Sequence, residues 1–270
     1  MTDFAELERD RWEHTVDDYY AACRPVTHRL IAPLLDAARV RAGCRVLDVG
    51  TGPGDVAAEA AERGADVVGL DFARAMISLA VRRHPSLRFV IADAVEPPFD
   101  DATFDAVVGN FTFHHIPDQP RAPASWRRLL RDRGCLALTV WDDPGKCRML
   151  GLFGDAVAAA GIRSADERAS APAMTAADEA YVALLDAAGF RPSSVRTIAF
   201  TIRPVSVDAL WTSVLAATVR TAAAITRETS EDQRRIREAF DRLTADYMTP
   251  DGLVVPVSVK LIAGRAAVID

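Results

Sequence analysis

Short apolar runs and longer runs with helical spacing alternate along the central part of this chain. The apolar runs are typical of buried strands, and the longer runs are typical of amphipathic helices. The predicted strands are Cys44–Val49, Asp66–Leu70, Leu87–Ile91, Asp105–Asn110 and Cys135–Trp141. The predicted helices between them are Asp55–Arg63, Ala73–Arg83 and Ala122–Arg131, and Gly134 is expected to stop the last helix before its strand. This alternation predicts an α/β fold: a doubly wound, mostly parallel sheet with helices on both faces.

The flanking parts of the chain are predicted to be mainly helical. The segment from Phe4 to about Arg41 has the spacing of two helices, and Met149, Leu152, Phe153 and Val157 indicate another. The segment Ser164–Thr175 is small, polar and interrupted by Pro172, so it is predicted to be a mobile loop. After it we expect helices at Thr175–Ala188, Ser206–Thr218 and Thr229–Tyr247, and strands at Ser194–Thr201 and Leu253–Ile262.

Composition narrows the classes of protein to consider. The chain has 270 residues, of which 50% are hydrophobic, which is enough for one large core in a single domain with insertions. Its net charge of −6 argues against a general attraction to nucleic acid. The amino terminus lacks the apolar region of a signal peptide, and no apolar run is long enough to span a membrane. The four cysteines are scattered without a C-x-x-C pair, so we predict a cytoplasmic protein with no zinc or redox site.

A glycine-rich turn follows the first predicted strand, with glycines at 50, 52 and 54 and a helix directly after them. Glycine has no Cβ, so a ligand can approach such a backbone closely. The next strand ends at Asp71, whose carboxylate can accept hydrogen bonds from both hydroxyls of a ribose. Ligands of such sheets bind beyond the carboxyl ends of the strands. The two features together predict a nucleoside-containing cofactor.

The spacing of the glycines separates two cofactor classes. The dinucleotide fingerprint needs glycine at the sixth position of the turn, where this chain has Asp55, and Pro53 removes a backbone donor. An acidic residue followed by G-x-G-x-G, here Asp48 to Gly54, instead resembles the first motif of class I S-adenosylmethionine (SAM) methyltransferases. The later run from Phe104 to Asp118, with His114 and His115, resembles the small-molecule members of quinone biosynthesis and secondary metabolism. The resemblance covers roughly Val46 to Trp141.

The resemblance implies a Rossmann-like sheet of seven strands with the last one antiparallel, SAM as cofactor and S-adenosylhomocysteine as product. It implies contacts from the glycine turn to the methionine end of SAM, from Asp71 to the ribose, and from Asp93 and Ala94 to adenine. The full set of expected cofactor-binding residues is Tyr20, Asp48, Gly50, Thr51, Gly52, Asp71, Phe72, Met76, Asp93, Ala94, Asn110 and His115. Alternatives remain for three of them: Tyr20 packs on the sheet, Met76 is a core residue, or Asp93 is a solvated turn residue.

Methyl transfer from SAM is a direct displacement, so the protein chiefly positions the acceptor and removes its proton where needed. Histidine titrates near neutrality, which makes His114 and His115 the candidate bases. Our hypothesis places His115 toward the cofactor and His114 toward the acceptor; the alternative is that His115 only packs. No metal is expected, because the fourth strand ends in Asn110 where a metal-dependent enzyme needs an acid.

The predicted organisation is one domain over residues 1–270, with a helical lid at 1–41 and a SAM-binding core at 42–142. Helical insertions at 143–190 and 203–250 are expected to form the acceptor pocket. Its candidate lining residues are Met149, Phe153, Met174, Trp211 and Leu215, and the alternative for each of them is packing in the core. The predicted partner is a small, apolar acceptor methylated on oxygen, carbon or nitrogen. The rival interpretations are a SAM-binding cyclase or rearrangement enzyme, an NAD-dependent oxidoreductase, and a non-catalytic SAM-binding module.

Overall fold

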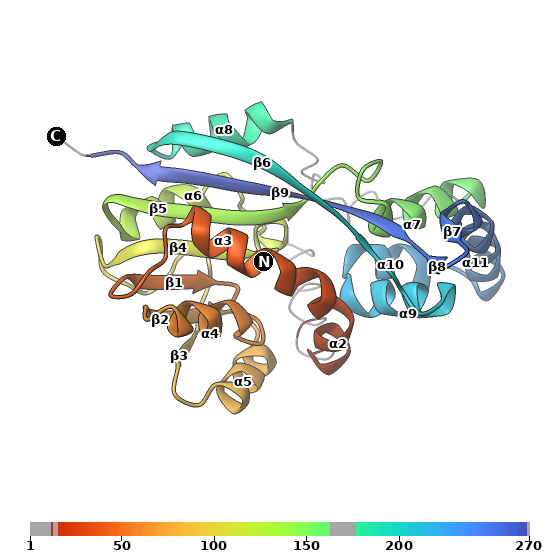
Figure 1. Cartoon of the computed structure of the whole chain (residues 1–270), viewed down its shortest axis with the longest axis horizontal. Helices are drawn as coiled ribbons and strands as arrows, with labels where there is room; N and C mark the ends of the chain where they lie inside the picture. The colour runs from red at the N-terminus through yellow and green to blue at the C-terminus, as the bar shows by residue number, and fades with distance from the viewer. Residues whose placement is uncertain (1–11, 13–15, 163–176, 269–270) are drawn as a thin grey trace.

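A seven-stranded sheet forms the centre of the molecule in this computed structural model, which describes residues 12, 16–162 and 177–268 (Figure 1). The strand order is β3-β2-β1-β4-β5-β9-β6. The strands are β1 (Arg45–Val49), β2 (Asp66–Asp71), β3 (Arg88–Ile91), β4 (Phe104–Asn110), β5 (Leu130–Trp141), β6 (Phe190–Ile202) and β9 (Val255–Ala266). Only β9 runs antiparallel to its neighbours, β5 and β6. The predicted doubly wound α/β fold with an antiparallel last strand is therefore confirmed.

Alternate residues of the strands face two helical layers, as expected for a sheet buried on both faces. On one face, Val46 and Val108 pack against α3 (Ile31–Ala37) and α4 (Asp55–Glu62). On the other face, Leu47 and Val107 pack against α6 (Ala122–Leu129) and α8 (Asp178–Ala187). The helix α5 (Arg74–Arg83) connects β2 to β3, and α2 (Val16–Thr27) precedes a short 3-10 helix and α3. The sheet core thus leaves the carboxyl ends of β1 to β4 free to form a site.

The long strands β6 and β9 continue past the sheet into a second, helical part of the molecule (Figure 1). This part contains α7 (Arg148–Ala159), α9 (Val207–Ala217), α10 (Arg220–Thr226), α11 (Ser230–Thr244) and a small hairpin of β7 (Met248–Thr249) and β8 (Gly252–Leu253). Its core is a cluster of aromatic rings, with Phe153, Trp211 and Phe240 within 4.5–5.3 Å of one another by ring centroid. No described helix combines the length and apolarity needed to cross a bilayer.

Several predicted boundaries differ from the structure. The helix α6 ends at Leu129, and Gly134 lies inside β5, so the prediction that Gly134 stops this helix is wrong. A Cβ at Gly134 would lie 2.9 Å from the carbonyl oxygen of Arg131 and 3.1 Å from that of Asp105, so close packing of backbone explains the glycine. The short helix α10 was not predicted. Thr175 and the predicted loop at 164–175 lie outside the described residues. The helix α11 is capped by Thr229, whose side chain accepts a hydrogen bond from the N–H of Asp232.

Candidate functional site

The glycine-rich turn after β1 is held in a conformation that only glycine adopts readily. Gly50, Gly52 and Gly54 have φ angles of +63°, +52° and +87°. A Cβ on Gly50 would lie 2.2 Å from Cγ2 of Thr112, whose hydroxyl donates a hydrogen bond to the Gly50 carbonyl oxygen at 3.2 Å. A Cβ on Gly52 would meet nothing within 4 Å, so the backbone there borders open space. The turn therefore presents bare backbone at the end of β1.

Asp71 links this turn to the end of β2. One carboxylate oxygen accepts a hydrogen bond from the backbone N–H of Gly52 at 3.0 Å, and the other accepts one from Ala73 at 2.9 Å. The residue is 7% exposed, and burial raises the pKa of its carboxyl to about 6. The carboxylate still has acceptor capacity, because each oxygen has two lone pairs. It therefore combines a fixed position with capacity for a ligand hydroxyl.

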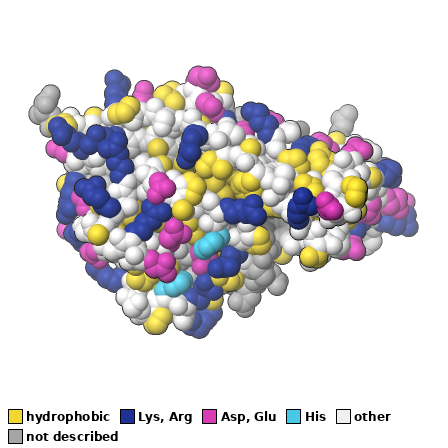
Figure 2. Space-filling view, viewed as in Figure 1, with side chains coloured by type: hydrophobic (Ala, Val, Ile, Leu, Met, Phe, Trp, Pro, Cys, Tyr) yellow, Lys and Arg dark blue, Asp and Glu magenta, His cyan; other side chains and the backbone are white. Residues whose placement is uncertain are grey.

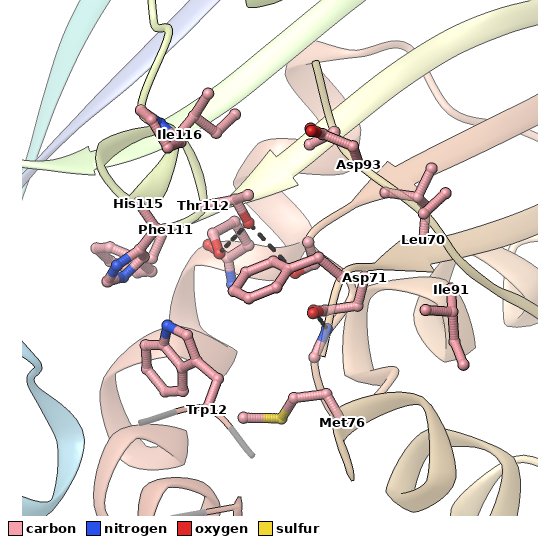
Figure 3. A pocket seen from close by; sticks show the side chains of 17 residues that line it. Trp12, Leu70, Asp71, Met76, Ile91, Asp93, Phe111, Thr112, His115 and Ile116 are labelled. Carbon is pink, nitrogen blue, oxygen red and sulfur yellow. Dashed lines mark hydrogen bonds between the residues drawn. The ribbon is translucent and has the colours of Figure 1, made fainter. Parts of the chain in front are cut away.

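A cavity of about 310 Å³ opens beside Asp71, beyond the carboxyl ends of β1 to β4 (Figure 3). Most of its surface is apolar, and polar atoms come from a few positions, as in sites for small molecules. Its lining includes Trp12, Gly50, Gly52, Leu70, Asp71, Phe72, Met76, Ile91, Ala92, Asp93, Ala94, Asn110, Phe111, Thr112, His115, Ile116 and Pro117. We refer to it below as the first cavity.

Four of the expected adenine and ribose contacts lie along one side of the first cavity. Met76 is buried and packs with Phe72 and Trp12, while Asp93 is exposed at the end of β3. The Asp93 carboxylate accepts a hydrogen bond from the N–H of Val95 at 2.7 Å. The carbonyl oxygen of Ala94 accepts one from the indole of Trp126 at 2.8 Å, which fixes the segment on which Asp93 lies.

The end of β4 forms the opposite side. Asn110 donates from its side chain to the carbonyl oxygen of Thr27 in α2 at 3.0 Å and accepts from the hydroxyl of Thr139 in β5 at 2.6 Å. Phe111 has a φ of +56°, a strained value for a residue with a side chain. Its N–H donates to both the carbonyl and the hydroxyl oxygen of Thr139. Contacts to β5 therefore maintain the strained backbone and aim the ring of Phe111.

The two histidines occupy a short 3-10 helix at Phe113–His115. The ring of His115 lines the first cavity and contacts Trp12 edge-on, with 5.2 Å between ring centroids. His114 is not part of that lining, although its ring centroid is 4.2 Å from that of His115. The roles of base for His114 and His115 stay predictions.

Three other expected cofactor residues lie around the turn rather than in the first cavity. Asp48 is buried and accepts a hydrogen bond from the hydroxyl of Thr51 at 2.6 Å, and burial raises the pKa of its carboxyl to about 7. Thr51 and Tyr20 line a cavity of about 50 Å³ on the α2 side of the turn. The guanidinium carbon of Arg83 lies 4.1 Å from the centroid of the Tyr20 ring. Asp48 lines neither cavity, so its place in the structure is that of a support for the turn.

Trp12, Phe111 and Thr112 line the first cavity but were not among the expected site residues. Trp12 carried a weak signal, because it lies in a partly aromatic stripe of the amino-terminal segment with Tyr19 and Tyr20. Phe111 and Thr112 follow β4 directly, at the strand edge where ligands of such sheets bind. Their position could therefore have indicated them, whereas the positive φ of Phe111 has no sequence signal.

The expected acceptor-pocket residues separate into three groups. Met149 lines another cavity, described below, and Met174 lies outside the described residues. Phe153 is 1% exposed in the aromatic core, and Trp211 and Leu215 pack against that core. Phe153 is therefore a core residue, because the rings of Trp211 and Phe240 cover it. Among the residues that the structure describes, no group of three or more His, Cys, Asp and Glu is arranged to hold a metal ion.

Comparison with known proteins identifies relatives of the central segment. Residues 47–138 match the model of a methyltransferase domain. A demethylmenaquinone methyltransferase of Beutenbergia cavernae is 36% identical over 44% of this chain and 50% of its own length. Nocamycin O-methyltransferase of Saccharothrix syringae is 37% identical over 43% of each chain. The chain thus spans about half the length of the curated relatives it matches. The YcgJ protein of Bacillus subtilis has the same fold, with a TM-score of 0.61, 18% identity and coverage of 90% of this chain and 100% of that one.

SAM is the methyl donor that this family implies, and the residues of the first cavity fit it. Gly50 and Gly52 border the cavity, and the open space beside Gly52 leaves room for an amino-acid end. Asp71 supplies acceptors for ribose hydroxyls. The apolar side chains beside Asp93 suit a purine ring. The strand order is that of the class I SAM-dependent methyltransferase fold, and the match over residues 47–138 shows that this segment is similar to a methyltransferase domain.

Proposed function

We propose that this protein transfers a methyl group from SAM to an oxygen, carbon or nitrogen atom of a small, apolar organic molecule. The observation that supports this most is the buried carboxylate of Asp71, which borders the same cavity as Gly50 and Gly52 and is fixed by two backbone donors. The printed names of the curated relatives, demethylmenaquinone and nocamycin methyltransferases, support a quinone-like or secondary-metabolite acceptor. We expect this chemistry in the cytoplasm.

When bound, SAM supplies a methyl group made electrophilic by its sulfonium. In this proposal, Asp71 accepts hydrogen bonds from the ribose, and the turn at Gly50 and Gly52 lies against the methionine end. Met76, Phe72 and the segment at Asp93 and Ala94 enclose the adenine. Asn110 orients the methionine end or the acceptor, and His115 takes a proton from the acceptor where the reaction releases one.

Calorimetric titration with SAM, S-adenosylhomocysteine and NAD tests the proposal. We expect binding of the first two only, weakened roughly 30-fold in Asp71→Ala through loss of a charged acceptor worth about 2 kcal/mol. Asp66→Ala is the matched control, since Asp66 lies exposed at the opposite end of the same strand. Binding of NAD, or equal affinities of the two variants, would contradict the proposal. Production of S-adenosylhomocysteine from a candidate acceptor then separates a methyltransferase from a cyclase or a binding module.

The pH dependence of binding is an independent test of Asp71 as the acceptor for the ribose hydroxyls. Because its pKa is raised to about 6, the free carboxyl is mostly protonated at pH 5 and mostly ionised at pH 7.5. The ionised form is the better acceptor for ribose hydroxyls, so affinity for S-adenosylhomocysteine should rise as the pH rises through 6. Asp71→Asn should flatten this rise, which the same titrations at the two pH values measure.

A further inference from the structure

A second cavity, of about 650 Å³, lies at the carboxyl ends of β5 and β6. Its walls come from α2 and the 3-10 helix after it, from β5 and α7, and from the end of β6 with the linker and α9 that follow it. Apolar side chains make most of its surface, among them Val26, Trp141, Met149 and Leu210. A volume of this size matches the ligand pockets of small-molecule proteins, which fall in the range of about 300–1,000 Å³.

The two cavities share a wall. Phe111 lines the first cavity and Trp141 lines the second, and their ring centroids are 4.2 Å apart. Asn110, which also borders the first cavity, is hydrogen-bonded to Thr27 of α2, the helix that lines the second cavity through Val26. An occupant of the second cavity therefore lies beside the residues that enclose the proposed methyl donor, with an apolar aromatic surface at that end.

The outer rim of the second cavity is positively charged. Arg29 and Arg203 line it, and both are exposed. No Asp or Glu is part of the lining among the described residues. Asp208, which lies on the wall helix α9 but outside the lining, is ion-paired with Arg237. Arg29 donates to the carbonyl oxygen of Thr201 at 3.4 Å and stacks over Phe200, and Arg203 has no carboxylate partner among the described residues.

The same rim exposes apolar surface. Val205 lines the cavity and is 94% exposed, although buried valine is the rule. On the face shown in Figure 2, hydrophobic side chains gather near the middle, with Lys and Arg side chains beside them. An apolar hollow with a cationic rim is complementary to a molecule that has an apolar body and one anionic end.

We propose that the second cavity binds the methyl acceptor, and that this acceptor is an amphipathic anion: it is apolar over most of its length and has one acidic end, which pairs with Arg29 and Arg203. The apolar end then lies against Trp141, toward the first cavity. The identification of the occupant as the acceptor rests on the proposed function; the binding of an amphipathic anion rests on the cavity alone.

The test uses two probes of equal shape, biphenyl-4-carboxylate and biphenyl-4-carboxamide, titrated calorimetrically into the full chain. We expect the carboxylate to bind at least fivefold more tightly, as one or two exposed ion pairs allow. The double variant Arg29→Gln/Arg203→Gln should bind both probes equally. Arg196→Gln, on the exposed edge of β6 and outside the lining, should keep the preference.

A filled-cavity variant locates the binding. Ser213→Trp places an indole in the second cavity and should abolish binding of both probes, while affinity for S-adenosylhomocysteine stays within twofold of the unmodified chain. Equal binding of the two probes, binding of neither, or an unchanged preference in the double arginine variant overturns the proposed anion site. If the unmodified chain does not bind S-adenosylhomocysteine, the proposed function is overturned instead. The failure of the anion site and the failure of the proposed function are therefore distinguishable.

Discussion

The two cavities are formed by different kinds of structure. The first is bordered by the ends of adjacent strands and by a turn whose backbone donates a hydrogen bond to Asp71 and accepts one from Thr112. The second is bordered by side chains from five separate segments. A site made of backbone at a sheet edge therefore has a local sequence pattern, whereas a site made of packed side chains has none. Substitutions at the first cavity and substitutions at the second cavity should therefore have separable effects on binding and stability.

The largest effect is expected in the core beneath the second cavity. Phe153→Ala should reduce the free energy of unfolding by about 4 kcal/mol, because the ring is buried against Trp211 and Phe240. Its affinity for S-adenosylhomocysteine should change less than twofold under folding conditions. Urea denaturation measures the loss, and the highly exposed Val205→Ala should lie within about 0.5 kcal/mol of the unmodified chain. A stable Phe153→Ala would instead place this ring on the cavity surface.

The next effect concerns the glycine turn. Gly50→Ala should lower affinity for S-adenosylhomocysteine by roughly 30-fold or more, about 2 kcal/mol, because the new Cβ collides with Thr112 and the φ of +63° disfavours alanine. Gly154→Ala is the matched control, since a Cβ there meets nothing within 4 Å and the position lies in α7. The control should retain full affinity and be somewhat more stable. Equal affinities for the two variants would show that the turn does not hold the cofactor.

Asp48 provides a stability test of the support beneath the turn. Its folded pKa of about 7 lies above the ordinary value of 3.8, so the folded state holds its proton more tightly than the unfolded state. The contribution of the Asp48 carboxyl to the free energy of unfolding is therefore lost as the pH rises from about 4 through 7. Asp48→Asn should be more stable than the unmodified chain at pH 8 by about 2 kcal/mol, and the difference should shrink toward pH 4. Denaturation at these two pH values measures the stability difference between the variant and the unmodified chain. A difference that is the same at both pH values would exclude titration of Asp48 as its cause.

The smallest effect concerns the wall between the cavities. Phe111→Gly and Phe111→Ala both remove the ring, but only glycine adopts a φ of +56° without strain. We expect the glycine variant to be more stable than the alanine variant by about 1 kcal/mol. Thermal and urea denaturation of the pair measure the difference. Equal stabilities would mean that the backbone relaxes when the ring is removed.

Local pattern was enough to predict much of the fold. Each central strand is a short apolar run next to a helical run, and the burial of alternate strand residues on two faces requires that composition. The start of α11 near Thr229 was predictable, because a threonine hydroxyl can accept a hydrogen bond from a backbone N–H a few residues later. The end of α6 was not predictable from Gly134, because this glycine allows close packing against the backbone of Asp105 and Arg131 and does not end the helix.

Local sequence patterns were enough to predict the fold class, the cofactor class and the place of Gly50, Gly52 and Asp71 at the strand ends, because a glycine turn and a carboxylate at strand ends are local features with fixed spacing. The packing of the folded chain, in contrast, brings Trp12 and Thr112 to the first cavity, buries Phe153 in the core, and places Arg29 and Arg203 on one rim. These relations join residues far apart in the chain. They depend on how helices pack after the strands have paired, which no local pattern encodes.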